Sequence, residues 1–363
     1  MRIPLTDREK PSNRIRSIFF EKVLMTGWAN QRLYHQIFIV VCLIAFLLPC
    51  YGVADFRHFE KNFWGRSWLI RAYADICLSL QNRTFDLSII GDGDWLIFTE
   101  ELDDYQKANP FTDETIVMIQ RKMDRLADRL EKQGVKKLIV VIAPNKSTIY
   151  PEYIPDAIPI VGRESRLDQL LAYEKHHGKV KILDVRPVLL EAKKQYPVFY
   201  RTDTHWNQTG SFLVYQAIMK EVQTEYPKHQ PRMLNDFQIM PKQYTGDISR
   251  MMIKADIVED TIQFVPLFHQ NTTTQVWWSE KEETPNRYLI TTVSHPDSTL
   301  PKLVMFRDSF STDIEPLIID HFSRSVLIWY PPSEEKFYEI EKPDVVIIEI
   351  VERNLQNLLE IPD

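Results

Sequence analysis

The residues that could do chemistry lie in two short stretches far apart along the chain. Asp203 and His205 stand in YRTDTHWNQTG, and Ser309 stands in RDSFST. A serine hydroxyl is a weak nucleophile until a base takes its proton, and an imidazole base works best when a carboxylate fixes its tautomer. Asp203 and His205 are two residues apart, so they project to the same side of an extended stretch. The sequence therefore contains the parts of a Ser-His-Asp triad.

Each of these residues also has an ordinary structural interpretation. Asp203 or Asn207 would make a good cap for the helix that follows, and Ser309 would cap the next one. His205 would fit a buried, hydrogen-bonded position. A metal ion would accept Asp203 and His205, but the sequence offers no convincing third ligand, so no metal site is predicted. Nothing in the sequence indicates a cofactor.

The segments around these residues alternate between apolar runs and amphipathic stretches. The apolar runs are typical of strands buried on both faces of a parallel sheet. The predicted strands are 136–143, 180–185, 302–306, 325–330 and 344–350. The predicted helices are 112–134, 162–178, 207–226 and about 311–322. Strands that alternate with helices predict a three-layer α/β/α fold with a parallel central sheet.

Ligands of such sheets bind at the carboxyl ends of the strands. The strand 302–306 runs directly into Ser309, which places this hydroxyl on a strand-to-helix turn, where helix amides stabilise an oxyanion. The strand 136–143 ends at Pro144-Asn145-Lys146. We expect Asn145 or Lys146 to offer a hydrogen-bond donor to the same cleft.

Composition excludes several other classes of protein. The chain has 363 residues, of which 44% are hydrophobic and 12% aromatic, so it can form a folded core. Its net charge of −6 lacks the basic footprint of a nucleic-acid-binding protein. Three cysteines without metal-ligand spacing argue against a disulfide framework. Residues 227–300 have weaker periodicity and are expected to form an insertion of loops and short strands.

One N-terminal segment departs from the pattern of a soluble domain. Residues 37–54 contain no charged side chain. This uncharged run has about the minimum length for a bilayer span. The residues before this run are rich in Arg and Lys, which predicts a cytoplasmic N-terminus over 1–35. We expect a transmembrane signal anchor over 36–54 and a periplasmic domain over 55–363, held at the inner membrane. The alternatives are a cleaved signal peptide and a lipoprotein leader.

Several motifs together resemble a known family. YRTDTHWNQTGSFLVYQAI, RDSFST, APNKSTIYPEYIP, GDGDWLIF and TGDISRMM occur in an order that resembles the SGNH hydrolase-like proteins of the AlgX/AlgJ type, the alginate O-acetyltransferase family. The resemblance covers about residues 85–355. It implies an SGNH-like fold with Ser309 as nucleophile, His205 as general base and Asp203 as its orienting acid. The chain ends soon after the last predicted strand, so we expect the form without a carbohydrate-binding module.

The resemblance also implies a reaction and its partners. Members take an acetyl group from a multi-spanning membrane acyltransferase and place it on hydroxyls of an exported polysaccharide. We expect the Ser309 amide and Asn145 to hold the oxyanion, and Asn207 to shape the helix entrance. The aromatic side chains expected to stack on sugar rings are Trp206, Trp277, Trp278 and Tyr330. Arg307 stands where the family usually has the glycine of GDSF.

Two other functions agree with the same residues. A carbohydrate acetyl esterase would use the same triad and release the acetyl group to water. A non-catalytic polysaccharide-binding subunit of an export complex would keep the fold without the reaction. The sequence does not identify the polysaccharide.

Overall fold

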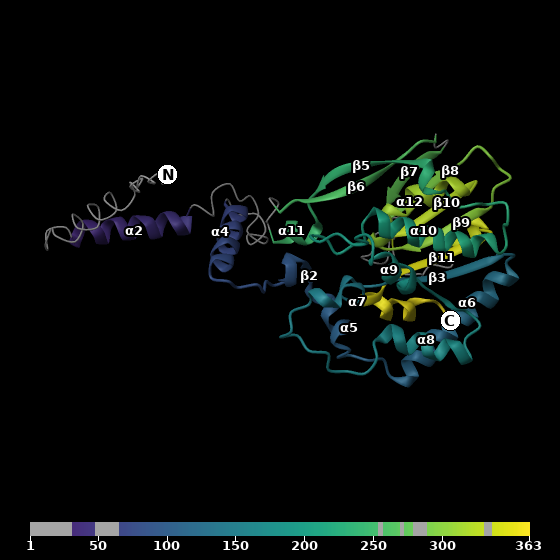
Figure 1. Cartoon of the computed structure of the whole chain (residues 1–363), viewed down its shortest axis with the longest axis horizontal. Helices are drawn as coiled ribbons and strands as arrows, with labels where there is room; N and C mark the ends of the chain where they lie inside the picture. Colours follow the sequence, from purple (N-terminus) through teal and green to yellow (C-terminus); the bar gives the residue numbers. More distant parts are fainter. Residues whose placement is uncertain (1–30, 48–64, 253–256, 269–271, 279–288, 330–335) are drawn as a thin grey trace, which may run out of the picture. The chain divides into compact units, whose positions relative to one another are not determined.

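The structure, a computed structural model, describes residues 31–47, 65–252, 257–268, 272–278, 289–329 and 336–363 (Figure 1). The chain divides into two compact units, residues 1–73 and 74–363. All the residues predicted for the triad belong to the second unit.

The first unit contains α2 (Gln31–Leu47) and the start of α4 (Arg66–Ser79). α2 includes the first part of the predicted anchor. Residues 48–54, the last part of the predicted anchor, lie outside the described residues. Within the described ranges, no helix combines the length and the apolar character needed to cross a membrane.

The second unit is built on a seven-stranded sheet with the order β4-β3-β11-β9-β10-β8-β7. The first five strands in this order are parallel, and β8 and β7 continue the sheet antiparallel to β10. The sheet is therefore mixed: the predicted parallel arrangement is confirmed for these five strands and is wrong for β8 and β7. Its strands are β3 (Lys137–Ala143), β4 (Ile182–Asp184), β7 (Thr273–Trp278), β8 (Leu289–Ser294), β9 (Lys302–Arg307), β10 (Arg324–Trp329) and β11 (Val345–Val351).

Apolar side chains of the central strands alternate between two cores, which gives the predicted three layers. In β11, Val345 and Ile347 join the core that includes α10, while Val346 and Ile348 join the core that includes α6. The helices of the first core are α9 (Arg186–Ala192), α10 (Gln208–Gln223) and α12 (Glu315–Ile318). Those of the second are α6 (Asp113–Lys132), α8 (Arg166–His177) and α13 (Lys336–Glu341). Figure 1 shows α6 and α8 together on one side of the sheet.

Two small antiparallel sheets lie outside the central one. They are formed by β1 (Ser88–Ile90) with β2 (Leu96–Phe98), and by β5 (Phe237–Tyr244) with β6 (Glu259–Pro266). Among the described residues, the other short helices are α5 (Leu102–Gln106), α7 (Lys146–Ile149) and α11 (Asp247–Met251). The 3-10 turns there include η4 (Asp92–Asp94), η5 (Thr99–Glu101), η6 (Pro151–Tyr153), η7 (Leu234–Asp236), η8 (Ser309–Asp313) and η9 (Ile319–His321). A further 3-10 segment, η10 (Glu352–Glu360), follows β11.

The predicted helix over about 311–322 is a series of short turns instead. The chain passes from η8 into α12 and then η9, and Pro316 lies in the first turn of α12. Proline has no N–H and is tolerated only in the first turn of a helix, so a single helix through this position would be broken there. The tighter 3-10 turn begins at Ser309 itself.

Candidate active site

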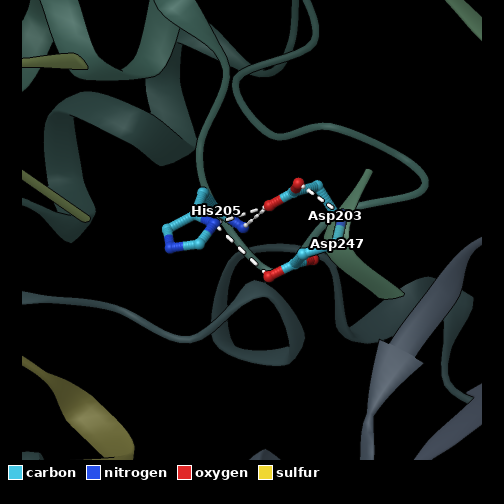
Figure 2. Close-up of side chains that lie close together, drawn as sticks. All are labelled: Asp203, His205 and Asp247. Atoms are coloured by element: carbon cyan, nitrogen blue, oxygen red, sulfur yellow. Dashed lines mark hydrogen bonds and ion pairs between the residues drawn. The ribbon is translucent and has the colours of Figure 1, made fainter. Parts of the chain in front are cut away.

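The fold brings the two chemistry-bearing stretches into direct contact. His205 Nε2 lies 2.7 Å from Ser309 Oγ, and His205 Nδ1 lies 2.6 Å from Asp203 Oδ1. Nδ1 therefore carries the proton donated to the carboxylate, which leaves Nε2 to accept from the serine. Figure 2 shows the carboxylates on the Nδ1 side of the ring, with the other ring nitrogen facing away from them. This is the geometry of a Ser-His-Asp triad.

Asp203 is held as a carboxylate by several donors. Its Oδ1 also accepts the His205 amide at 3.0 Å, and its Oδ2 accepts the Tyr244 hydroxyl at 2.8 Å and the Asp247 amide at 2.7 Å. Burial raises the pKa of Asp203, but the hydrogen bonds and the charge of His205 outweigh it and bring the pKa below its usual 3.8. The acid that orients the imidazole is thus fixed in its charged form.

Asp247 is a second carboxyl group at the imidazole, and the sequence interpretation missed it. Its Oδ2 lies 3.6 Å from His205 Nδ1. Its carboxylate accepts the Thr204 amide at 2.7 Å and the Thr204 hydroxyl at 2.6 Å. Burial and the neighbouring charge of Asp203 raise the pKa of Asp247. The signal was available in the motif TGDISRMM, but nothing in the sequence placed that motif beside residue 205.

Lys146 fixes the segment that carries Asp203 and His205. The side chain is fully buried, and Nζ donates to the backbone oxygens of Leu96 and Asp203, both at 2.5 Å. Nζ also lies 3.3 Å from the backbone oxygens of Tyr200 and Arg201. Burial lowers the pKa of Lys146, and carboxylates including Glu101 and Asp203 oppose that shift. Lys146 therefore holds the segment from within the core. The prediction that its side chain offers a donor to the cleft is not supported.

The turn that carries Ser309 is fixed by side chains on both sides of it. Asp308 accepts the Phe310 amide at 2.9 Å and the Val351 amide at 2.8 Å. The Trp206 indole donates to the Phe310 carbonyl at 2.9 Å, which ties this turn to the segment of His205. Ser309 is the first residue of η8, so its own N–H has no carbonyl one turn earlier in the helix and can donate to an oxyanion.

Arg307 stabilises the same turn. Its guanidinium donates to the Asp308 carbonyl at 3.1 Å, pairs with Glu315 and lies 4.2 Å from the centre of the Trp329 ring. The residue is 6% exposed. The positive charge of Arg307 is therefore paired with Glu315 inside the fold.

A cleft of about 210 Å³ opens over the serine and the imidazole. Tyr200 and Tyr244, whose rings stack with centroids 4.1 Å apart, form part of its wall. Arg250 and Asp313 bring a positive and an acidic group to the same space, and burial raises the pKa of Asp313. The cleft is large enough for an acyl group and the end of its acceptor.

The structure does not bring all the predicted binding residues to this cleft. Asn145 is fully buried, and its Nδ2 donates to Asp104 at 3.1 Å, so its predicted role as oxyanion donor is not supported. Trp206 borders the cleft but is 1% exposed, which leaves no ring face for a sugar. Asn207 caps α10 by accepting the Gly210 amide at 3.1 Å, as expected of a residue that shapes the helix entrance. Tyr330 and the side chains of Trp277 and Trp278 lie outside the described residues.

Asp203, His205 and Asp247 could also be considered as metal ligands, because one ligand atom of each lies within 4.8 Å of the others. The observed contacts are those of a protonated ring nitrogen donating to a carboxylate. A cation at this position would displace the proton that orients the imidazole toward Ser309. The donor set therefore fits the hydrogen-bonded triad better than a metal centre.

The chain matches the model of the family described as "SGNH hydrolase-like domain, acetyltransferase AlgX" over residues 89–298, more than half of its length. It belongs to this AlgX family. The match includes Asp203, His205 and Asp247 and ends before Ser309, so the place of the serine rests on the geometry above.

Curated relatives agree with the AlgX family. The chain is 28% identical over 196 residues to the probable alginate O-acetylase AlgJ of Pseudomonas syringae pv. tomato, which is 54% of this chain and 49% of that protein. With the AlgJ of Pseudomonas aeruginosa it shares 28% identity over 167 residues, 46% of this chain and 40% of that protein. The chain thus spans about half the length of the curated relatives it matches.

Two solved structures share the fold at low sequence identity. Bacillus cereus PatB1, solved with a sulfonyl adduct, superposes with a TM-score of 0.54 and 15% identity over 75% of this chain and 99% of that one. A DHHW family protein from Eubacterium siraeum gives a TM-score of 0.52 and 13% identity over 76% and 93% of the two chains. These likenesses establish the fold.

The burial of Lys146 predicts a large effect on stability. Replacing Lys146 with Met removes the donor and leaves buried carbonyl oxygens unpaired, at a cost of roughly 3 kcal/mol or more. Denaturant unfolding of both proteins would measure the difference. Lys194, which is exposed and paired only with Glu191, provides the matched control, and Lys194→Met should change stability by less than about 0.5 kcal/mol. Equal losses in the two variants would contradict the assigned role.

The lowered pKa of Asp203 predicts a pH-dependent contribution to stability. A group whose folded pKa is depressed stabilises the fold above its unfolded pKa and loses that contribution as pH falls toward the folded pKa. Asp203→Asn should therefore destabilise the domain most at neutral pH, and the difference from the native protein should shrink below about pH 4. Unfolding free energies measured across this range test it, with the exposed Asp86→Asn as control. A difference that stays constant with pH would exclude a charged Asp203 as its cause.

Proposed function

We propose that this protein is an O-acetyltransferase that moves an acetyl group through Ser309 onto hydroxyls of an exported polysaccharide. The observation that carries the proposal is the continuous hydrogen-bonded chain from Asp203 through His205 to Ser309. Membership of the AlgX family supports acetyl transfer as the reaction. The names of the AlgJ relatives support a polysaccharide acceptor of the alginate kind.

The first half-reaction loads the acetyl group onto the enzyme. His205 Nε2 takes the proton of Ser309 as Oγ attacks the ester carbonyl carbon of the donor, and the carbonyl oxygen becomes an oxyanion. The Ser309 amide faces that charge. The intermediate collapses, the bond to the donor's alcohol oxygen breaks, and His205 returns the proton to that oxygen. An acetyl ester on Ser309 remains.

The second half-reaction runs the same steps with a sugar hydroxyl as the nucleophile. His205 removes the proton from that hydroxyl, the sugar oxygen bonds to the acetyl carbon, and Ser309 leaves with the proton returned by His205. Asp203 stabilises the imidazolium that forms in each half. The same residues would perform hydrolysis if water took the place of the sugar. The ratio of transferred to free acetate therefore defines the activity.

We further propose that a multi-spanning membrane acyltransferase supplies the acetyl donor and that the domain works in the periplasm. The uncharged run 37–54 and the basic residues before it support an anchored topology. A domain on that side of the membrane is separated from cytoplasmic acetyl donors, so a membrane protein must pass the acetyl group across.

Replacing Ser309 with Ala should reduce acetyl transfer by about three orders of magnitude or more, because the nucleophile is lost while the fold is kept. Transfer from an activated acetyl ester to an oligosaccharide would be followed by mass spectrometry, with the acyl-enzyme mapped by peptide. Ser298→Ala, on an exposed turn, is the control and should retain full activity.

The same assay separates the competing functions. An acetyl adduct on a residue other than Ser309 would exclude this serine as nucleophile. Free acetate in place of acetylated sugar would identify an esterase. Unchanged acetylation of the polymer in cells by both Ser309→Ala and His205→Ala would leave only a non-catalytic role.

The anchored topology predicts how the native chain fractionates. The full chain should remain with membranes after an alkaline carbonate wash, and protease added to spheroplasts should digest the domain while an N-terminal tag stays protected. Release by carbonate, or a mature mass that lacks the first residues, would contradict an uncleaved anchor.

A further inference from the structure

A buried glutamate lies directly against the turn of Ser309. Glu349 belongs to β11, in which Ile348 pairs with Phe306 of β9, so the next residue lies at the point where β9 gives way to the turn. Glu349 is 1% exposed. Alternation along the strand places it on the same side of the sheet as Val345 and Ile347, which face the core of α10.

One carboxyl oxygen of Glu349 accepts two hydrogen bonds, and the other accepts none from the described residues. Oε2 accepts the Asp308 amide at 3.0 Å and the Ser311 hydroxyl at 2.8 Å, one donor from each side of Ser309. Oε1 is buried, and no donor among the described residues reaches it. A buried carboxylate oxygen without a donor is costly, whereas the O–H of a protonated carboxyl can itself donate.

Asp308 is the acidic neighbour of Glu349, and its backbone amide donates to Glu349 Oε2 at 3.0 Å. The charge of the half-buried Asp308 opposes ionisation of the fully buried Glu349. Both carboxylate oxygens of Asp308 already accept backbone amides, from Phe310 and Val351, whereas one oxygen of the more deeply buried Glu349 accepts none from the described residues. Glu349 is therefore the group that carries a proton. Burial and the charge of Asp308 raise the pKa of Glu349 well above its usual value, which agrees with this assignment.

We propose that Glu349 is a neutral carboxylic acid that positions the Ser309 turn by accepting the Asp308 amide and the Ser311 hydroxyl, one from each side of the serine. It acts on the nucleophile through the turn and touches neither donor nor acceptor. The inference concerns how the proposed nucleophile is held, and rests on the proposed function only for the reaction that this serine performs.

The other charged groups near this end of the sheet are already engaged. On β9, Arg307 pairs with Glu315. After β11, Glu352 accepts the Asn145 amide and the Thr148 hydroxyl, and the Arg353 guanidinium lies 5.4 Å from the centre of the Phe310 ring. Asp308 is thus the charged group in contact with Glu349.

A proton held in this way makes the turn sensitive to alkali. A group whose folded pKa is raised stabilises the fold at low pH, and the contribution is lost as pH rises through the folded pKa. Ionised Glu349 would face Asp308 with like charge and would place its own charge on a buried carboxyl group of which one oxygen meets no donor among the described residues. Glutamine has nearly the same shape, and its amide supplies both the donor and the acceptor without titrating.

The test compares the native full chain with Glu349→Gln and Glu349→Leu. Thermal midpoints are measured from neutral to alkaline pH, together with the rate at which phenylmethylsulfonyl fluoride modifies Ser309. In that reaction the serine oxygen bonds to sulfur, fluoride leaves, and His205 takes the proton. Glu360→Gln, at an exposed position, is the matched control.

At neutral pH we expect Glu349→Gln to be modified by the sulfonyl fluoride within about threefold of the native rate. At alkaline pH the thermal midpoint and the modification rate should fall in the native protein and stay unchanged in Glu349→Gln. Glu349→Leu should react at least tenfold more slowly at every pH. Parallel pH curves for the native protein and Glu349→Gln would overturn the proposal. Divergent thermal curves without modification of Ser309 would support the neutral Glu349 and refute the nucleophile of the proposed function.

Discussion

The hydrogen bond between the His205 imidazole and the Ser309 hydroxyl is the contact that the proposed chemistry requires and that the rest of the domain positions. It joins residues 104 positions apart, so neither local stretch can form it alone. A base and its nucleophile must be placed to within a few tenths of an ångström, which requires each to stand on a segment with little freedom. The fold supplies two such segments and the Trp206 indole that ties one to the other.

The two segments are fixed by side chains of opposite hydrogen-bonding character. The buried ammonium of Lys146 donates to backbone carbonyls around Asp203, whereas the carboxyl groups of the half-buried Asp308 and the buried Glu349 accept backbone amides around Ser309. In each case a charged or acidic side chain takes up backbone groups that a turn leaves without secondary-structure partners. Such groups are costly to bury, but fully satisfied networks define a single conformation, which an active site needs.

The sheet explains why the site can be shared by distant relatives. The parallel strands β3, β11 and β9 end at the same end of the sheet, where Lys146 follows β3 and Ser309 follows β9. In the strand order, the antiparallel strands β8 and β7 follow β10 and are separated by it from β9, β11 and β3. Bacillus cereus PatB1 keeps the fold at 15% identity, as expected if packing of the apolar strands, and not particular residues, defines the framework.

The sequence by itself determined the central strands, because continuous apolar runs such as 344–350 have a stable place only between two helical layers. It also supplied Asp203, His205 and Ser309, through motifs that resemble a known family, whereas their spacing alone fits helix caps equally well. Only the tertiary structure decided which side chains surround them. Asp247 and Glu349 belong to segments that are distant in the sequence, and the side chain of Asn145 donates to the buried Asp104. These contacts depend on which backbone groups remain unpaired after the sheet forms. The mixed sheet and the broken turns after Ser309 were missed for a related reason. Strand direction and the effect of Pro316 depend on neighbours that the local pattern does not show.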